Sequence, residues 1–213
     1  IREHTELILR TLMPPKIVEE IRSMHEPPTH VYRSAVIAQS DLVGFTALAS
    51  TLEPEKVVGM IERLFTAFDE LTTKYGIYKV ETVGDAYIAG QAELPLTERV
   101  WPISVVLFGL QMVTETQAWS RAHGWKVNCR VGIAYGECIG GIVGRGMQRY
   151  HLFGELMTCL EVLESTAPEG RVQVSIACKE VVEKQLQKES LPSSLFEFER
   201  RIGSHLTTSK GEA

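Results

Sequence analysis

Two aspartates beside glycine residues have the side chains and spacing to support metal chemistry. Asp41 follows an apolar run at residues 35–38, and Asp85 lies in a Gly-Asp pair between two stretches that alternate like strands. Proteins hold Mg²⁺ and Mn²⁺ with one or two carboxylates, and substrate phosphates and water complete the coordination. After Asp41, residues 42–46 lead toward a helix, whose free backbone amides can bind phosphate oxygens. Alternatively, both aspartates cap a helix or a turn.

The elements that must position these aspartates alternate between strands and helices. Pro54 opens a helix whose apolar residues recur at three- and four-residue steps until Gly76, and a second helix with an apolar face runs from Trp101 to about Gly124. Residues 195–199 alternate like an edge strand. The other strands are predicted at residues 35–38, 78–83, 86–89, 127–134, 138–143 and 171–176.

This order of elements predicts an α+β fold. A core of strand, helix, strand, strand, helix, strand favours an antiparallel sheet with both helices on one face, the ferredoxin-like βαββαβ arrangement, here with extra C-terminal strands. In that topology the first two strands run in the same direction and the third returns between them. The end of the first strand and the hairpin after the second then share one edge of the sheet. We expect this edge to bring Asp41 and Asp85 together.

Length and composition limit the remaining classes of protein. The chain has 213 residues, 44% of them apolar and 23% charged, which suits one folded domain at residues 31–213. Its net charge of −5 argues against a nucleic-acid partner. No apolar run reaches the roughly 18 residues that a membrane-spanning helix needs. The four cysteines form no CxxC pair and are interpreted as reduced thiols of a cytosolic protein.

Residues 1–30 differ from the rest of the chain. Their apolar residues have helical spacing that Pro14-Pro15 interrupts, and Pro27-Pro28 closes the segment. We interpret this segment as an amphipathic helical linker. The alternative is a signalling or dimerising helix that connects an upstream sensor to the domain behind it.

Five segments closely resemble the catalytic domains of class III nucleotidyl cyclases. They follow one another in the order found in that family, and the resemblance covers about residues 32–184. The first two contain the aspartates and match the metal-site segments of the family. The segments are Ser40-Asp41-Leu42-Val43-Gly44-Phe45-Thr46, Tyr78-Lys79-Val80-Glu81-Thr82-Val83-Gly84-Asp85-Ala86-Tyr87, Arg130-Val131-Gly132-Ile133, Gly141-Ile142-Val143-Gly144 and Arg149-Tyr150-His151-Leu152-Phe153-Gly154.

The resemblance implies an enzyme that makes a cyclic nucleotide and pyrophosphate in the cleft between two catalytic domains paired head to tail. The ribose 3′-hydroxyl attacks the α-phosphate with the help of two divalent cations, Mg²⁺ or Mn²⁺. By this resemblance the metal ligands are Asp41, Asp85 and the carbonyl of Leu42, and the catalytic residues are the two aspartates and Arg130. The phosphate-binding residues are Val43, Gly44, Phe45, Thr46 and Arg130.

Two further positions concern the nucleotide base. Guanylyl cyclases are similar to this chain in having glutamate at the position of Glu81, where adenylyl cyclases usually have lysine. A carboxylate can accept hydrogen bonds from N1–H and the 2-amino group of guanine, which adenine lacks. The second base position carries His151, where guanylyl cyclases usually have cysteine. Its imidazole could donate to guanine O6, or it could fill a site that binds no base. The resemblance therefore favours GTP.

The chain departs from the family in the helix that follows His151. Family members with a complete site have asparagine where this chain has Thr158, and arginine where it has Val162. In heterodimeric cyclases one half keeps the aspartates and lacks these two residues, whereas the other half keeps the asparagine and arginine. This chain resembles the metal-binding half. It is expected to need a complementary cyclase domain, on the same or another chain, and alone to form at most a homodimer without a complete site.

Three other interpretations stay open. The domain could be half of an adenylyl cyclase, because the partner half would select the base. It could be a regulatory pseudo-cyclase without activity, or an unrelated ferredoxin-like ligand-binding module. We expect the domain in the cytoplasm, on its own or as part of a larger membrane-attached protein.

Overall fold

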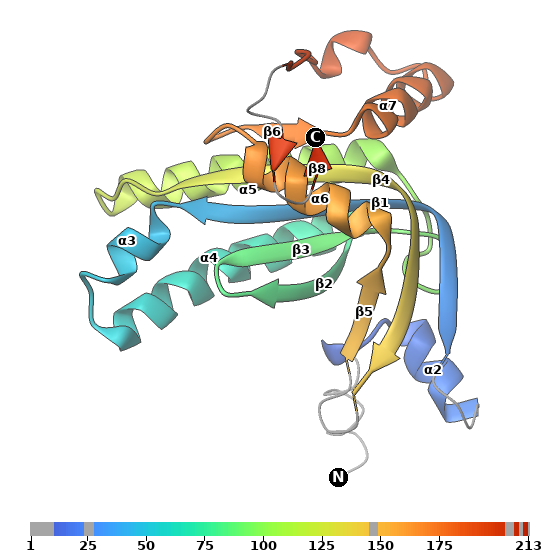
Figure 1. Cartoon of the computed structure of the whole chain (residues 1–213), viewed down its shortest axis with the longest axis horizontal. Helices are drawn as coiled ribbons and strands as arrows, with labels where there is room; N and C mark the ends of the chain where they lie inside the picture. Colours follow the sequence, from blue (N-terminus) through green and yellow to red (C-terminus); the bar gives the residue numbers. More distant parts are fainter. Residues whose placement is uncertain (1–10, 24–27, 145–148, 203–206, 209–210, 213) are drawn as a thin grey trace.

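The sheet that positions the site is seen in a computed structural model, which describes residues 11–23, 28–144, 149–202, 207–208 and 211–212 (Figure 1). Its strands are β1 (Thr29–Val43), β2 (Tyr78–Val83), β3 (Ala86–Gln91), β4 (Asn128–Val143), β5 (Arg149–Phe153) and β6 (Val172–Val174). The helices are α2 (Pro15–Ser23), α3 (Phe45–Ala49), α4 (Pro54–Tyr75), α5 (Pro102–Ala122), α6 (Glu155–Thr166), α7 (Ile176–Lys188) and the 3-10 helix η1 (Ser193–Leu195). A separate small hairpin pairs β7 (Thr207–Thr208) with β8 (Gly211–Glu212).

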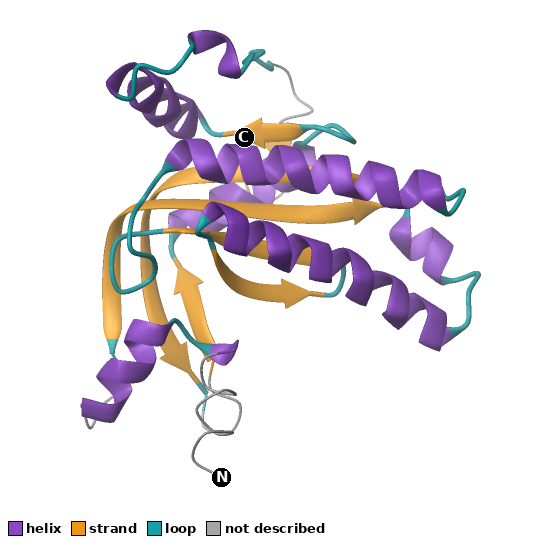
Figure 2. Cartoon of the chain, turned by 180° about the vertical axis from the view of Figure 1, so that it is seen from behind, coloured by secondary structure: helices purple, strands orange, loops and turns teal. Residues whose placement is uncertain are grey.

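The topology of the sheet is the predicted ferredoxin-like one. The strands pair in the order β2-β3-β1-β4-β5, and β6 pairs with β4 in parallel. Because β3 is antiparallel to both β1 and β2, the first two strands run in the same direction with the third between them. Helices α4 and α5 lie side by side on one face (Figure 2), and α6 lies on the other (Figure 1). The fold class predicted from the sequence is therefore confirmed.

Two cores, one on each face of the sheet, explain why the middle of β1 is apolar at consecutive positions. Successive side chains of a strand point to opposite faces. Val36 and Ala38 pack into the core that α4 and α5 close, whereas Ala35 and Ile37 pack into the core that α2 and α6 close. Each large apolar side chain buried in this way contributes about 1.5–3 kcal/mol to folding.

Helix α4 follows its sequence signals closely. Proline at the first position needs no backbone donor there, and the helix buries Leu64, Phe68 and Leu71 on one face. Gly76 ends it with φ of 63°, in the left-handed region that favours glycine, and the Gly76 amide bonds back to the last turn. The predicted helix from Pro54 to Gly76 is confirmed.

The prediction of two strands at residues 127–134 and 138–143 is wrong. The structure has one strand, β4, because it stays paired with β1 across this segment, with a shift of register between Tyr32 and Ala35. Tyr135 lies opposite Val36, and Gly136 lies opposite Ala35. A glycine weakens a strand but does not end it when the neighbouring strand supplies hydrogen-bond partners on either side.

The C-terminal part also differs from the prediction. The strand expected at 171–176 is only β6, because Ser175 caps α7 by accepting a hydrogen bond from the Cys178 amide at 3.1 Å. Residues 195–199 form no strand. Phe196 and Phe198 instead pack their rings, with centroids 6.0 Å apart, against the core beside α7. Alternation there reflects one buried face and not strand pairing.

Helix α2 belongs to the N-terminal segment, and its apolar face is buried. Ile17 and Val18 pack into the core that α6 closes, and Glu20 Oε2 lies 2.9 Å from His30 Nε2 of β1. The helical character expected around Pro14-Pro15 is present, since α2 begins at Pro15; the first ten residues lie outside the described part. None of the described helices is long and apolar enough to span a bilayer.

Candidate functional site

The two aspartates lie side by side at one edge of the sheet. Ser40 of β1 lies opposite Tyr87 of β3, so the next residue of β1, Asp41, lies beside the β2–β3 turn that contains Asp85. Burial is the main factor that raises the pKa of Asp85, and the neighbouring Asp41 carboxylate raises it further. A partly buried carboxyl group whose ionised form is disfavoured by a neighbouring carboxylate is suited to binding a cation.

The segment at residues 42–46 connects Asp41 to helix α3 through a tight turn at Gly44. Gly44 has φ of 84°, and a Cβ atom there would lie 2.6 Å from the carbonyl oxygen of Lys126, so only glycine fits. The next element, α3, has five residues and is too short to build much of a helix dipole. Leu42 and Phe45 are buried, whereas Thr46 is exposed. The phosphate-binding role of residues 43–46 stays a prediction.

Arg130 lies between the aspartates and α6. It is opposite Asp41 in the β1–β4 ladder, and its Nη2 lies 3.0 Å from Asp41 Oδ2. Its Nε donates to Glu164 Oε1 at 2.7 Å, and its Nη1 donates to the Ser165 carbonyl at 3.3 Å. The phosphate-binding role of Arg130 stays a prediction, and its partner Glu164 is not predicted from the sequence. The signal for Glu164 is an acidic residue four positions after Leu160, on the apolar face of the helix.

The two predicted base-reading residues also meet. His151 Nδ1 lies 3.6 Å from Glu81 Oε2, and both side chains are partly exposed. The contact crosses from β2 to β5, which lie at opposite ends of the pairing order and yet touch. Glu81 lies opposite Ile88, which packs into the core on the α6 face, so the pair lies on that side of the sheet.

The two departures from the family pattern lie on α6. Thr158 is exposed, whereas Val162, one turn later, is 2% exposed. Neither side chain carries a charge, and valine has no hydrogen-bond donor. This helix therefore brings Glu164 to Arg130 but offers no cation of its own at position 162.

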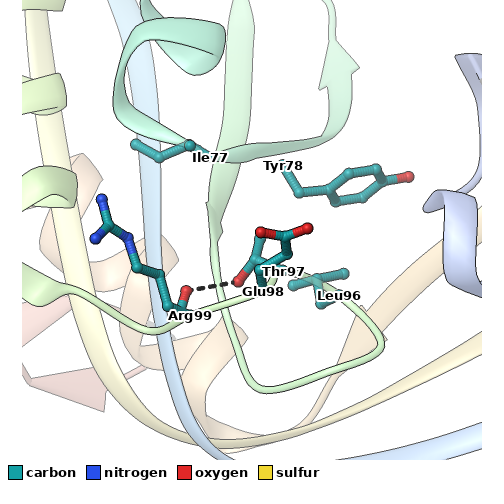
Figure 3. A pocket seen from close by; sticks show the side chains of 7 residues that line it. Ile77, Tyr78, Leu96, Thr97, Glu98 and Arg99 are labelled. Atoms are coloured by element: carbon teal, nitrogen blue, oxygen red, sulfur yellow. Dashed lines mark hydrogen bonds between the residues drawn. The ribbon is translucent and has the colours of Figure 1, made fainter.

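A pocket elsewhere in the described part of the chain is separate from this site. It has a volume of about 540 Å³ and lies between the start of β2 and the loop at residues 96–99, where Thr97 Oγ1 donates to the Arg99 carbonyl (Figure 3). Asp85 follows the other end of β2, and six residues of strand span about 20 Å. The carboxylate pair, whose two residues are partly buried, therefore lies away from this pocket.

A metal ion would need ligands besides the side chains of this chain. The described residues contain no group of three or more His, Cys, Asp or Glu side chains that could hold a metal. Two neighbouring carboxylates fit a hard cation that also binds substrate phosphates and water. The residues present therefore fit Mg²⁺ or Mn²⁺ bound together with a nucleotide.

Comparison with known proteins identifies the family. The sequence model for the adenylate and guanylate cyclase catalytic domain matches residues 28–211. The chain belongs to this family. Family members use divalent cations, in agreement with the carboxylate pair described above. The chain is 33% identical over 183 residues to the speract receptor of Strongylocentrotus purpuratus, covering 84% of this chain and 16% of that protein.

Other relatives and solved structures agree. The chain is 31% identical over 185 residues to the receptor-type guanylate cyclase gcy-13 of Caenorhabditis elegans, covering 85% of this chain and 18% of the relative. The guanylate cyclase domain of RhGC from Catenaria anguillulae, solved in complex with GTP, superposes with a TM-score of 0.65 at 25% identity, covering 74% of this chain and 84% of that one. The chain thus spans less than a fifth of these receptor-type relatives.

Proposed function

We propose that this cyclase domain is the metal-binding half of a guanylate cyclase, which converts GTP to 3′,5′-cyclic GMP and pyrophosphate together with a second cyclase catalytic domain. The observation that carries the proposal is the pair Asp41 and Asp85 at one edge of the sheet, with Arg130 in contact with Asp41. The guanylate cyclases among the relatives and the glutamate at position 81 support GTP as the substrate.

The chemistry assigned to the chain's residues is electrostatic. In the reaction a bond forms between the ribose 3′-oxygen and the α-phosphorus, the bond from that phosphorus to pyrophosphate breaks, and the hydroxyl proton passes to water. Two divalent cations, when bound, lower the pKa of the hydroxyl and neutralise the phosphates. Asp41, Asp85 and the Leu42 carbonyl would hold these cations. Arg130 has donors that would bind the terminal phosphates.

A partner domain is required because α6 lacks the asparagine and the arginine of a complete site. Loss of one positioned donor to the transition state lowers the rate by about 10²–10³. Thr158 and Val162 cannot replace the amide and the guanidinium of a complete site, so a partner with asparagine and arginine at the matching positions would supply them. In such a pair Glu81 and His151 would face the second cleft, and the partner's residues would select the base.

The test is a cyclase assay with Mn²⁺, offering GTP and ATP to the domain alone and to its mixture with a cyclase domain that carries the asparagine and arginine. We expect cyclic GMP from the mixture only. The double variant Asp41→Ala, Asp85→Ala should abolish it, whereas Glu98→Gln, an exposed carboxylate at the distant pocket, should leave it unchanged.

The other outcomes of this assay decide between the alternatives. Cyclic AMP from ATP, with little product from GTP, would assign the chain to an adenylate cyclase. No product in any mixture would make it a regulatory pseudo-cyclase. Full activity of the domain alone would show that Thr158 and Val162 are no obstacle, and the division into halves would be wrong.

The relatives also suggest a setting for the domain. They are receptors several times longer than this chain. We propose that residues 31–213 form the cytoplasmic catalytic domain of a larger membrane-attached protein, and that residues 1–30 connect it to the part upstream.

A further inference from the structure

Glu164 is a buried carboxylate that the proposed chemistry does not use. It is 7% exposed, and its two oxygens accept hydrogen bonds from Arg130 Nε at 2.7 Å and from Gln39 Nε2 at 3.3 Å. Burial raises the pKa of Glu164, and Arg130 counteracts that effect. An acidic side chain at this depth is rarely kept unless it is paired, and its partner here is the arginine beside the predicted metal ligand.

A glycine in β4 allows Glu164 to reach this position. A Cβ atom at Gly132 would lie 2.4 Å from the Glu164 backbone nitrogen, so the last turn of α6 rests directly on the strand. Gly132 and Arg130 are two residues apart and lie on the same face of β4. The close approach of α6 therefore places the Glu164 carboxylate next to the Arg130 guanidinium.

The guanidinium of Arg130 contacts two carboxylates, Glu164 and Asp41. Nε and Nη1 donate to α6, at Glu164 Oε1 and the Ser165 carbonyl, and only Nη2 contacts Asp41. Arginine otherwise favours a fork-like pair, with two parallel hydrogen bonds to one carboxylate. Such a pair on Asp41 would engage both of its oxygens and so compete with a cation for them.

We propose that Glu164 is a positioning residue that holds Arg130 on α6 and thereby keeps the Asp41 carboxylate available to a divalent cation. This inference rests on the proposed metal-binding role of Asp41 and Asp85. It gives α6 a role at the proposed metal site of Asp41 and Asp85, and this role does not involve positions 158 and 162. Glu164 acts only through Arg130 and touches neither cation nor nucleotide.

The experiment measures Mn²⁺ affinity of the full chain by the loss of the electron paramagnetic resonance signal of free Mn²⁺. Glu164→Gln should weaken binding about tenfold, the effect of one charge-assisted hydrogen bond. Arg130→Gln should strengthen it, because the cation that competes for Asp41 is gone. In the Arg130→Gln background, Glu164→Gln should have no further effect.

Two more variants separate positioning from charge and from folding. Glu164→Asp keeps the charge but is one methylene shorter, so it should also weaken Mn²⁺ binding if the contact with Arg130 matters. Glu169→Gln removes an exposed carboxylate just beyond α6 and should change nothing. Thermal unfolding of each variant shows whether it is folded, and Glu164→Asp carries the test if Glu164→Gln does not fold.

The outcomes are distinct. If Glu164→Gln weakens Mn²⁺ binding equally in the unmodified chain and in the Arg130→Gln background, Glu164 acts through its own charge, and the inference is overturned. Unchanged affinity in both Glu164 variants would overturn it as well. The double variant Asp41→Asn, Asp85→Asn tests the proposed function. If the unmodified chain binds no Mn²⁺, or if the double variant binds it equally well, the proposed function fails, and the inference fails with it.

Discussion

Gly132→Ala tests the close contact on which the arrangement of the site depends. The new Cβ would lie 2.4 Å from the Glu164 nitrogen and 2.9 Å from two further backbone atoms of α6, whereas ordinary contacts begin at 3.4 Å. The helix would have to retreat by about 1 Å, a form of overpacking that costs about 1–3 kcal/mol. For a domain of this size each kcal/mol lowers Tm by about 2–4 °C, so we expect a loss of about 2–12 °C.

The assay is thermal unfolding by circular dichroism, with Gly59→Ala as the matched control. Gly59 lies inside α4, and apart from the backbone of its own helix and its chain neighbours no atom lies within 4 Å of an added Cβ, so alanine there should stabilise the helix by up to about 1 kcal/mol. Gly132→Ala should also weaken Mn²⁺ binding, because a retreat of this size breaks the 2.7 Å contact between Glu164 and Arg130. If both alanine variants have the Tm of the unmodified chain or a higher one, the contact of α6 with β4 is not tight and the reasoning is refuted.

The Tyr32–Tyr150 contact, the cysteines and Asp85 provide three further tests. Tyr150→Phe leaves the buried Tyr32 hydroxyl without its 2.6 Å partner and should lower the free energy of unfolding in urea by about 1–3 kcal/mol; adding Tyr32→Phe should recover most of it. Asp85→Asn should lower cyclic GMP formation by the mixed enzyme about 100-fold or more without lowering Tm, since burial and Asp41 disfavour the ionised form; retained activity would contradict this. Burial raises the pKa of three thiols to about 12, so at pH 8 iodoacetamide should label Cys159 first, as measured by mass spectrometry. The free energy of unfolding should also fall as the pH rises above about 9, because there only the thiols of the unfolded chain ionise. The three thiols are Cys129, Cys138 and Cys178.

The sequence predicted those parts of the fold that depend on local signals. The helix from Pro54 to Gly76 has a proline at its start, a regular apolar face and a glycine at its end, and the structure follows all three. Once the order of elements was known, chain topology was sufficient to place Asp41 beside Asp85. Helix α7 is not predicted, because the residues before it have strand-like alternation that extends to position 176. The spacing of Cys178 and Val182 after a serine cap is nevertheless helical.

Other features could not be predicted because they depend on contacts distant in sequence. Whether Gly136 ends a strand is decided by the ladder that β1 offers, and nothing in the local sequence records it. The pairing of Arg130 with Glu164 requires the depth at which α6 packs, which a glycine on another element sets. Resemblance to a family gave the candidate residues but not the partners that hold them.

Under the proposed division into two halves, the geometry of α6 explains how this domain can lack part of the site and keep the rest. Thr158 lies exposed in the first turn of this helix, whereas Glu164 is buried in its last turn on β4, so the two positions contact different surroundings. A change at the exposed Thr158 is therefore expected to leave the contact of α6 with Gly132 and Arg130 intact. The proposed metal site then depends on the packing of one helix turn, and in the proposed pairing the domain would present Asp41 and Asp85 to a partner that supplies the arginine. If this separation holds, Thr158→Asn will leave Mn²⁺ affinity unchanged, whereas Gly132→Ala will not.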